Sequence, residues 1–336
     1  MGTSLTLIGL LLAYAPNSLA QSSSVKIETQ NKSTLKIEKP AGSTTSDSTN
    51  DIDNKITDAR LRAALGSKSK WSFKSRMNYA GGSLAMPFHK ITPNIRNNGS
   101  MESMSALTGD VGVNYRLSPS DSISMGTGIL MVAPLHGDPS KSVSDERNDR
   151  NETQSRYQVS SPFIEWQKGY LMWDTMMMTS VKYMHSTNSD AVDLMKSFGN
   201  IFIFQHVSKN IGTSRWTVGA SGLMMKSFYS GQITDPKLRA AQTMGILKRH
   251  EYVLGVVPSL QYAITERFSL RSDFVYANFI KFEDDDSFTH DDPFQSVGLG
   301  VSITRDIYLY PNVQFSVKDI HSDRSNVALM ANINLF

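Results

Sequence analysis

The sequence has no cysteine among its 336 residues and no large excess of charge of either sign. The absence of cysteine excludes a disulfide framework, a thiolate metal site and a cysteine nucleophile. The 34 lysine and arginine residues are nearly balanced by 31 aspartate and glutamate residues, which leaves a formal net charge of +3. Because nucleic-acid binding needs a concentrated basic face, this balance argues against a nucleic-acid partner.

Long apolar runs are also missing from most of the chain. Beyond the N-terminus, no stretch approaches the roughly 20 apolar residues that a membrane-spanning helix needs. The mean hydropathy of -0.28 resembles that of a soluble protein. These features exclude only helical membrane proteins, because the strands of a membrane β-barrel alternate apolar and polar residues and average out as polar.

The N-terminal region predicts export. Residues 5–13 form an apolar core of secretory length, and Ser18-Leu19-Ala20 places small residues where a signal peptidase reads them. We therefore expect residues 1–20 to be a removed signal peptide. Residues 21–66 follow as a flexible periplasmic leader, since residues 21–50 contain scarcely any large apolar residue. Within this leader the sequence predicts a short helix near residues 56–64, capped by Thr57 or Asp58.

Residues 67–336 show a different pattern, an alternation of apolar and polar residues that is typical of β-strands with one apolar face. Polar turns separate the alternating segments. The predicted strands are 71–80, 106–117, 121–132, 156–167, 171–184, 199–209, 214–227, 251–264, 267–281, 294–304, 307–318 and 326–336.

The connections between these twelve strands alternate in length. Short turns are expected at residues 118–120, 168–170, 210–212, 265–266 and 305–306, and long loops join the strands at the other end. The strands reach the length of about 10 residues that a tilted strand needs to cross a bilayer. The sequence therefore predicts an all-β fold, a transmembrane antiparallel up-and-down β-barrel with short periplasmic turns and longer extracellular loops. A soluble sandwich would carry more lysine and glutamate on its outward faces.

Aromatic residues gather at the end with the short turns, where all four tryptophans are expected. This position predicts a periplasmic aromatic girdle. Its members would be Trp71, Tyr115, Trp166, Trp173, Trp216, Tyr262 and Phe268.

Over residues 71–336 the chain resembles the Gram-negative outer-membrane β-barrels of the porin-like kind with about twelve strands. The signal peptide and a final strand that ends in Phe336 carry this resemblance, although Phe336 is out of phase with the apolar face of that strand. The resemblance implies an outer-membrane location and contact with membrane lipid and lipopolysaccharide. It also implies that the barrel-assembly machinery recognises the C-terminal Phe336.

The polar face of the strands would line the lumen and set charge selectivity. The charged residues expected there are Lys74, Arg76, Asp110, Arg116, Asp174, Lys182, Arg271 and Asp273. Five of these are basic and three acidic, which predicts a passive channel for small polar solutes with a weak anion preference. The same residues could instead pair with one another as a satisfied network. The lumen could be open, or it could be plugged by residues 51–66 or by a long loop.

Other functions are weighed against the channel. A closed barrel with a structural or surface-interaction role, such as adhesion or binding of lipopolysaccharide or a partner protein, is the alternative. A lipid-modifying enzyme is a remote third, because the phospholipase-like segment from His185 to Asn188 places Thr187 where a serine nucleophile would stand. We expect no enzyme activity and no cofactor. The acidic loop with Asp284, Asp285 and Asp286 lacks an ordered calcium-binding pattern, so we expect a solvated loop there rather than a metal site.

Overall fold

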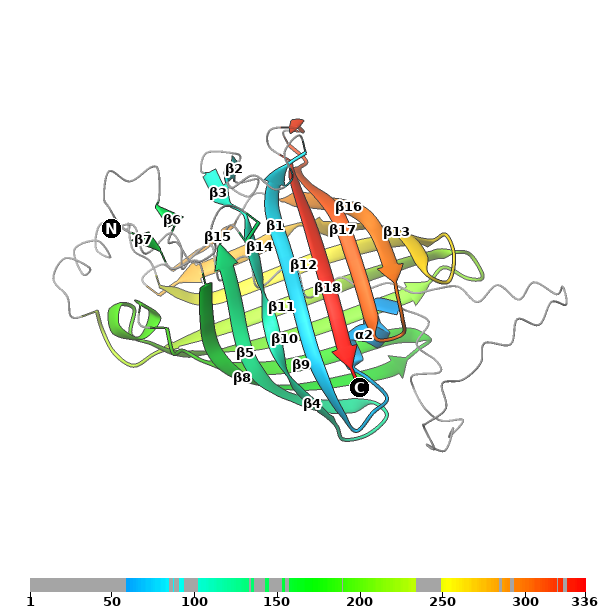
Figure 1. The fold of residues 1–336 in the computed structure, drawn as a ribbon, viewed down its shortest axis with the longest axis horizontal. Coiled ribbons are helices and arrows are strands. Elements are labelled where there is room, and N and C mark those ends of the chain that lie inside the picture. Colours follow the sequence, from blue (N-terminus) through cyan, green and yellow to red (C-terminus); the bar gives the residue numbers. More distant parts are fainter. Residues whose placement is uncertain are drawn as a thin grey trace, which may run out of the picture.

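A computed structural model gives the fold of the chain (Figure 1). The structure describes residues 59–84, 87, 91–93, 102–132, 134–135, 143–144, 153–154, 157–188, 190–233, 249–283, 286–290, 293–318, 320–322 and 325–336. The predicted signal peptide and most of the predicted leader lie outside these residues, as do Asp284 and Asp285.

Twelve long antiparallel strands form the wall of a closed barrel, which confirms the predicted architecture. The wall consists of β1 (Trp71–Ser83), β4 (Ala106–Arg116), β5 (Asp121–Val132), β8 (Tyr157–Met172), β9 (Thr175–His185), β10 (Ser197–Asn210), β11 (Trp216–Tyr229), β12 (His250–Ala263), β13 (Phe268–Val275) continued by β14 (Ala277–Phe282), β16 (Phe294–Ser302), β17 (Ile307–Ser316) and β18 (Asn326–Leu335).

Pairing of the first strand with the last closes the barrel. β1 pairs with β18 from Phe73 opposite Leu335 to Ser83 opposite Asn326, and β11 pairs with β12 on the far side. Every other strand pairs with its neighbours in the sequence. Closure leaves no edge strand in the long-strand wall, as a membrane-spanning sheet requires because lipid cannot satisfy free backbone groups.

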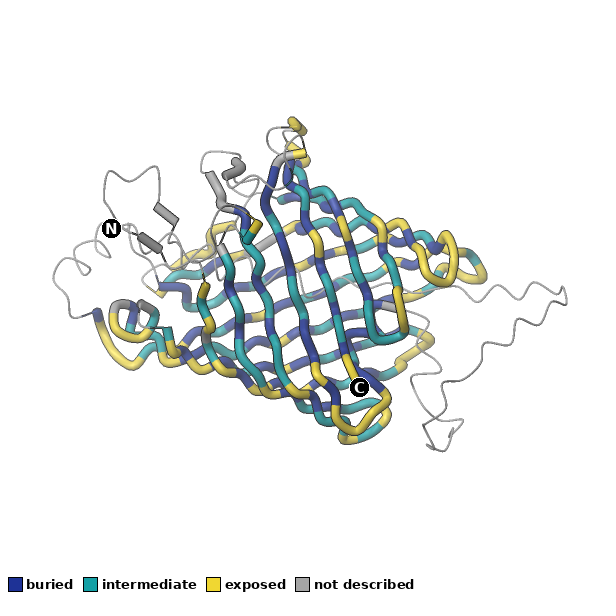
Figure 2. Tube along the Cα trace, viewed as in Figure 1, coloured by how far each residue is buried: buried dark blue, intermediate teal, exposed yellow. Residues whose placement is uncertain are grey.

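Alternation along each strand decides which side chains face the lumen. In β9 and β17 buried residues occupy every second position, and Figure 2 shows the same alternation around the barrel. The buried positions are mostly serine, asparagine, glutamine and charged residues, whereas Val113, Met125 and Ile164 are exposed on the outside. The polar side is therefore the interior, and the apolar side is the one that meets lipid.

Short connections of two to five residues join the strands at one end, at residues 117–120, 173–174, 211–215, 264–267 and 303–306. The longer connections at the opposite end contain the remaining elements. These are β2 (Ile91–Pro93), β3 (Glu102–Met104), β6 (Val143–Ser144), β7 (Thr153–Gln154), the π-helix η3 (Asp190–Leu194) and β15 (Phe288–His290). Within the described part of the chain, the α-helix α2 (Ala59–Leu65) precedes the first strand.

The turn between β8 and β9 differs from the prediction. The sequence placed it at residues 168–170, but the strands run on and Met172 pairs with Thr175. Trp173 and Asp174 form the two-residue turn, with φ angles of 51° and 56°. Positive φ at both central residues matches the twist of a tight hairpin. Gly169, which looked like a turn residue, is instead a buried strand residue.

The strand predicted at residues 267–281 is interrupted at Tyr276. Ser259 of β12 faces Asp273 of β13, whereas Val256 faces Ala277 of β14. The β13–β14 segment thus holds one residue more than its partner over this stretch, which is a bulge. Pro258 lies at the break on β12 and has no N–H to donate to the ladder, which accounts for the interruption.

Among the described residues, no helix is long and apolar enough to cross a membrane.

Candidate channel lumen

Five charged side chains on the inner face of neighbouring strands form a single network, which we call the lumen charge cluster. Its members are Lys74 and Arg76 of β1, Asp110 of β4, Glu165 of β8 and Lys182 of β9. Arg76 Nη2 lies 2.6 Å from Asp110 Oδ2 and 2.9 Å from Glu165 Oε2. Lys182 Nζ lies 2.7 Å from Asp110 Oδ1, and Lys74 Nζ lies 3.4 Å from Glu165 Oε2. Three cations therefore share two carboxylates.

Neutral polar groups complete the hydrogen bonding of the cluster. Ser180 Oγ donates to Glu165 Oε1 over 2.7 Å, and Lys74 Nζ donates to Gln167 Oε1 over 2.9 Å. Glu165 has no exposed surface and Lys182 has 3%. Buried charges are retained only when they are paired and hydrogen-bonded. The cluster is thus a fixed patch on the lumen wall with one net positive charge.

A second ion pair lies on the inner face of β13. Arg271 Nε donates to Asp273 Oδ2 over 2.9 Å, and its Nη2 lies 2.5 Å from Oδ1, so the pair is bidentate. The guanidinium stands over the ring of Tyr310, 5.4 Å from the centroid. The Tyr310 hydroxyl donates to the backbone oxygen of Arg271. This pair adds no net charge to the lumen.

The structure brings most of the predicted lumen residues to the inner face. These are Lys74, Arg76, Asp110, Lys182, Arg271 and Asp273. The prediction for Asp174 is wrong, because this residue is exposed in the β8–β9 turn. Arg116 lies at the periplasmic mouth, where its guanidinium donates to the carbonyl groups of Ser118 and Pro119.

Glu165 was missed by the sequence analysis. The signal was present, since Phe163, Glu165 and Gln167 alternate with the outward Ile164 and Trp166. With Glu165 included, the numbers of positive and negative side chains that face the lumen from the described strands are closer to equal than in the predicted set.

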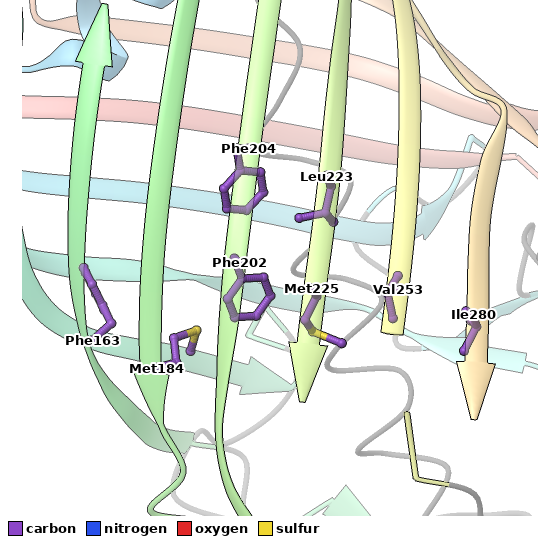
Figure 3. Packing of buried hydrophobic residues seen from close by; sticks show 8 residues of the cluster. All are labelled: Phe163, Met184, Phe202, Phe204, Leu223, Met225, Val253 and Ile280. Atoms are coloured by element: carbon purple, nitrogen blue, oxygen red, sulfur yellow. The ribbon is translucent and has the colours of Figure 1, made fainter. Parts of the chain in front are cut away.

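An apolar patch covers the inner wall at the extracellular half of the barrel, and we call it the apolar wall (Figure 3). It is built from β8, β9, β10, β11, β12 and β14 by Phe163, Met184, Phe202, Phe204, Leu223, Met225, Val253 and Ile280. The apolar wall borders the lumen charge cluster, because Lys182 Nζ lies 4.2 Å from the centroid of the Phe163 ring.

Helix α2 lies inside the barrel at its periplasmic end, where Figure 1 shows it near the C-terminus of the chain. Leu61 and Ala64 pack against Met176 and Met178 of β9. The opposite side of the helix places Ala63 in a cluster with Tyr308 and Tyr310 of β17 and Met330 of β18. Five wall strands separate β9 from β17 in either direction around the barrel when β13 and β14 are taken as one. The helix therefore spans the lumen from wall to wall.

Polar contacts hold the C-terminal end of α2. The Asn334 side chain donates to the carbonyl oxygen of Ala63, and Arg305 Nη1 donates to that of Gly66 over 3.3 Å. Gly66 follows the helix with a φ of 100°, the left-handed conformation that commonly ends a helix. Gly169 makes room for the helix, since a Cβ atom there would lie 2.9 Å from Leu65 Cδ1.

The aromatic residues of the predicted girdle lie on the outer surface near the short turns. Two ring pairs join register partners on adjacent strands, with centroids 4.6 Å apart for Trp71 and Tyr115 and 4.9 Å apart for Trp216 and Tyr262. Phe268 is the first residue of β13. Trp173 is 83% exposed in the turn between β8 and β9. Trp166 pairs in the register with Ile123 of the neighbouring β5. The predicted end of β8 at residue 167 is wrong, because this strand continues to Met172, so Trp166 does not lie at its end.

A closed barrel with a polar interior, an apolar exterior and interfacial aromatic side chains fits a bilayer and no soluble architecture. The chain forms an outer-membrane β-barrel. The barrel has solved structural relatives at low identity. An outer membrane channel from Pseudomonas putida F1 matches with 10% identity over 81% of this chain and 97% of its own, at a TM-score of 0.46.

Two further structures are similar to the barrel. The outer membrane protein Omp33 of Acinetobacter baumannii has 9% identity, with 79% of this chain and 98% of its own covered, at a TM-score of 0.34. The calcium-bound dimer of the outer membrane phospholipase from Salmonella typhi has 11% identity, with 79% and 90% covered, at a TM-score of 0.30. No protein-family model and no curated protein matches the sequence.

The phospholipase-like segment does not bring a serine to its histidine. His185 lies beside Tyr183 and packs edge-on against Phe198. Ser186 Oγ bonds to Ser197 Oγ at 2.8 Å, and Thr187 Oγ1 accepts the N–H of Ser161. The absence of enzyme activity stays a prediction.

Two remaining predicted sites lie at the ends of the barrel. Phe336 follows β18 with a φ of 83° and is 83% exposed. Of the acidic loop, the structure describes Asp286, which is exposed. No group of three or more potential metal ligands occurs within the described part of the chain.

Proposed function

We propose that the barrel is a channel for small solutes whose periplasmic end is closed by α2. The contact of α2 with two opposite walls supports this proposal most directly. The helix precedes the first strand and takes part in no strand pairing, so it can leave the lumen while the backbone hydrogen bonds between the barrel strands stay intact. In the closed channel α2 lies inside the barrel, and in the open channel it has left the lumen. The barrel wall is the same in both states.

The inner surface indicates which solutes are favoured. The lumen charge cluster has one net positive charge, and a mixed ring of charges selects by sign. Small polar solutes with a weak preference for anions are therefore the proposed cargo. Because the apolar wall precedes this cluster on the extracellular side, an anion with an apolar part gains contacts in both regions.

Conductance measurements on point variants of the full chain test the gate. Leu61 is fully buried against β9, so Leu61→Asp places a carboxylate among methionine side chains and should release α2. We expect brief, rare openings for the unmodified protein in planar bilayers and long openings for Leu61→Asp.

A disulfide that can be formed and then reduced provides the matched control. The chain has no cysteine, and Leu65 lies against Gly169, so Leu65→Cys with Gly169→Cys introduces one disulfide between α2 and β8. The oxidised protein should stay closed, and reduction should restore the brief openings expected of the unmodified protein. If neither Leu61→Asp nor the reduced pair conducts while both remain folded barrels, the channel proposal is wrong and a closed barrel with a surface role is favoured.

A further inference from the structure

The outer surface of β11, β12 and β14 carries a lateral row of three residues, which we call the basic row. Lys226 of β11 faces Tyr252 of β12 in the register, and Tyr252 faces Lys281 of β14. The Lys226 ammonium lies 4.0 Å from the centroid of the Tyr252 ring. Met225, Val253 and Ile280, which are next to these residues in the sequence, point into the lumen. Because side chains alternate along a strand, the three residues of the row face the lipid.

The carboxylate of Glu251 forms an ion pair with both lysines of the row. Glu251 Oε1 lies 2.8 Å from Lys226 Nζ, and Oε2 lies 2.6 Å from Lys281 Nζ. Two ammonium groups and one carboxylate leave one net positive charge. The lysine side chains are 26% and 27% exposed, and each ammonium has three donors. The contacts with Glu251 use one donor of each lysine, so the row can still donate to an anion from outside.

The basic row lies at a defined depth in the membrane. On β11, Lys226 stands ten residues beyond Trp216, a member of the periplasmic girdle. A rise of about 3.3 Å per residue at a tilt of about 40° places it roughly 25 Å above that girdle, which equals the height of the apolar band of an outer-membrane barrel. The exposed residues between the two levels are apolar, including Val218 and Met224 on β11 and Val256 and Leu260 on β12.

The basic row therefore meets the head groups of the outer leaflet. We propose that it is a binding site for a phosphate group of a phosphorylated glycolipid head group, such as that of lipopolysaccharide. Lysine ammonium groups bind phosphate as point charges. Lys226 and Lys281 lie on either side of β12 and already meet at the one carboxylate of Glu251, so both can approach one phosphate together. The acyl chains of the same lipid would lie on the apolar residues below the row. This site depends on the outer-membrane location and is independent of the proposed channel.

Three variants of the purified barrel test the site through the affinity for lipopolysaccharide in detergent. The pair Lys226→Gln with Lys281→Gln should weaken binding about 30-fold, since each basic residue near an anionic lipid surface contributes on the order of fivefold. Glu251→Gln should strengthen binding about fivefold, because it frees both lysines from their shared partner. Lys168→Gln is the control, since Lys168 is an outward lysine that lies on the periplasmic side next to Asp121; it should change nothing.

The opposite effects of the lysine and glutamate substitutions separate binding from stability. Both break the same ion contacts, so a purely structural triad would lower the unfolding temperature in each case and leave the affinity unchanged. Equal binding by all variants, or weaker binding by Glu251→Gln, would overturn the proposal. Dephosphorylated glycolipid should bind no better to the unmodified barrel than to the lysine variant. Inorganic phosphate should not compete at millimolar concentration; competition would assign the site to free phosphate instead.

Discussion

At the scale of single residues, Glu165 is the carboxylate on which the lumen charge cluster depends. It is fully buried, pairs with Arg76 and Lys74, and accepts from Ser180. Glu165→Gln removes one of two negative charges that serve three cations. Removing one partner of a buried ion pair costs about 3–5 kcal/mol, so we expect a lower free energy of unfolding together with a shift of the zero-current potential toward anions. Urea unfolding and reversal potentials measure the two effects.

Glu266→Gln is the matched control for that substitution, because Glu266 is exposed in a periplasmic turn. It removes the same charge from the molecule without touching the lumen. Equal changes in the two variants would show that the net charge of the protein, and not the cluster, sets selectivity.

At the scale of elements, the short helix α2 depends on how its C-terminal end is fixed. Gly66 has a φ of 100°, and a Cβ atom there would lie 2.8 Å from Asn114 Nδ2. A side chain in left-handed conformation costs roughly 1–2 kcal/mol. Gly66→Ala should therefore weaken docking of α2 and raise the open probability roughly 5- to 30-fold in single-channel recordings.

Gly212→Ala separates crowding near the helix from backbone strain in general. Gly212 also has a positive φ, of 55°, but nothing lies within 4 Å of a Cβ atom there. This variant should lose some stability and keep the open probability of the unmodified barrel. An increase in both variants would mean that wall stability, and not α2, controls opening.

At the scale of the whole molecule, the residue predicted to act as the assembly signal lies outside the barrel wall. Phe336 lies beyond β18 and is almost fully exposed, so it adds little to the packing of the folded protein. If Phe336 is read by the barrel-assembly machinery, Phe336→Ser should lower the yield of folded barrel in the outer membrane and leave the unfolding midpoint of the purified protein unchanged. A normal yield would remove the assembly role of this residue.

Charge selectivity is also a property of the whole lumen. The lumen charge cluster contributes one positive charge, and the Arg271–Asp273 pair contributes none. With Leu61→Asp as the open form, a salt gradient should give a small zero-current potential of the sign expected for anions. A preference for cations would contradict the proposed selectivity.

The sequence by itself determined the strands, because alternation is a local property that the two faces of each strand impose residue by residue. The run from Gln295 to Ser302 and the run from Ile307 to Ser316 predict their inward residues without knowledge of any partner strand. The local pattern was insufficient where a residue is determined by its contact with a segment that is distant in the sequence. Gly169 interrupts the pattern of β8 because Leu65 of α2 needs the space, and the sequence alone made it a turn.

Only the tertiary structure decided what fills the lumen. Lys74 and Glu165 are separated by 91 positions, and Ala63 and Asn334 by 271, and the curvature and closure of the wall bring each pair together. The alternation along a strand places a charged side chain in the lumen, but it does not identify the oppositely charged residue with which that side chain pairs. Likewise, the apolar residues of a short helix require a partner surface, and the partner became known only once β9 and β17 stood on opposite sides of one closed barrel.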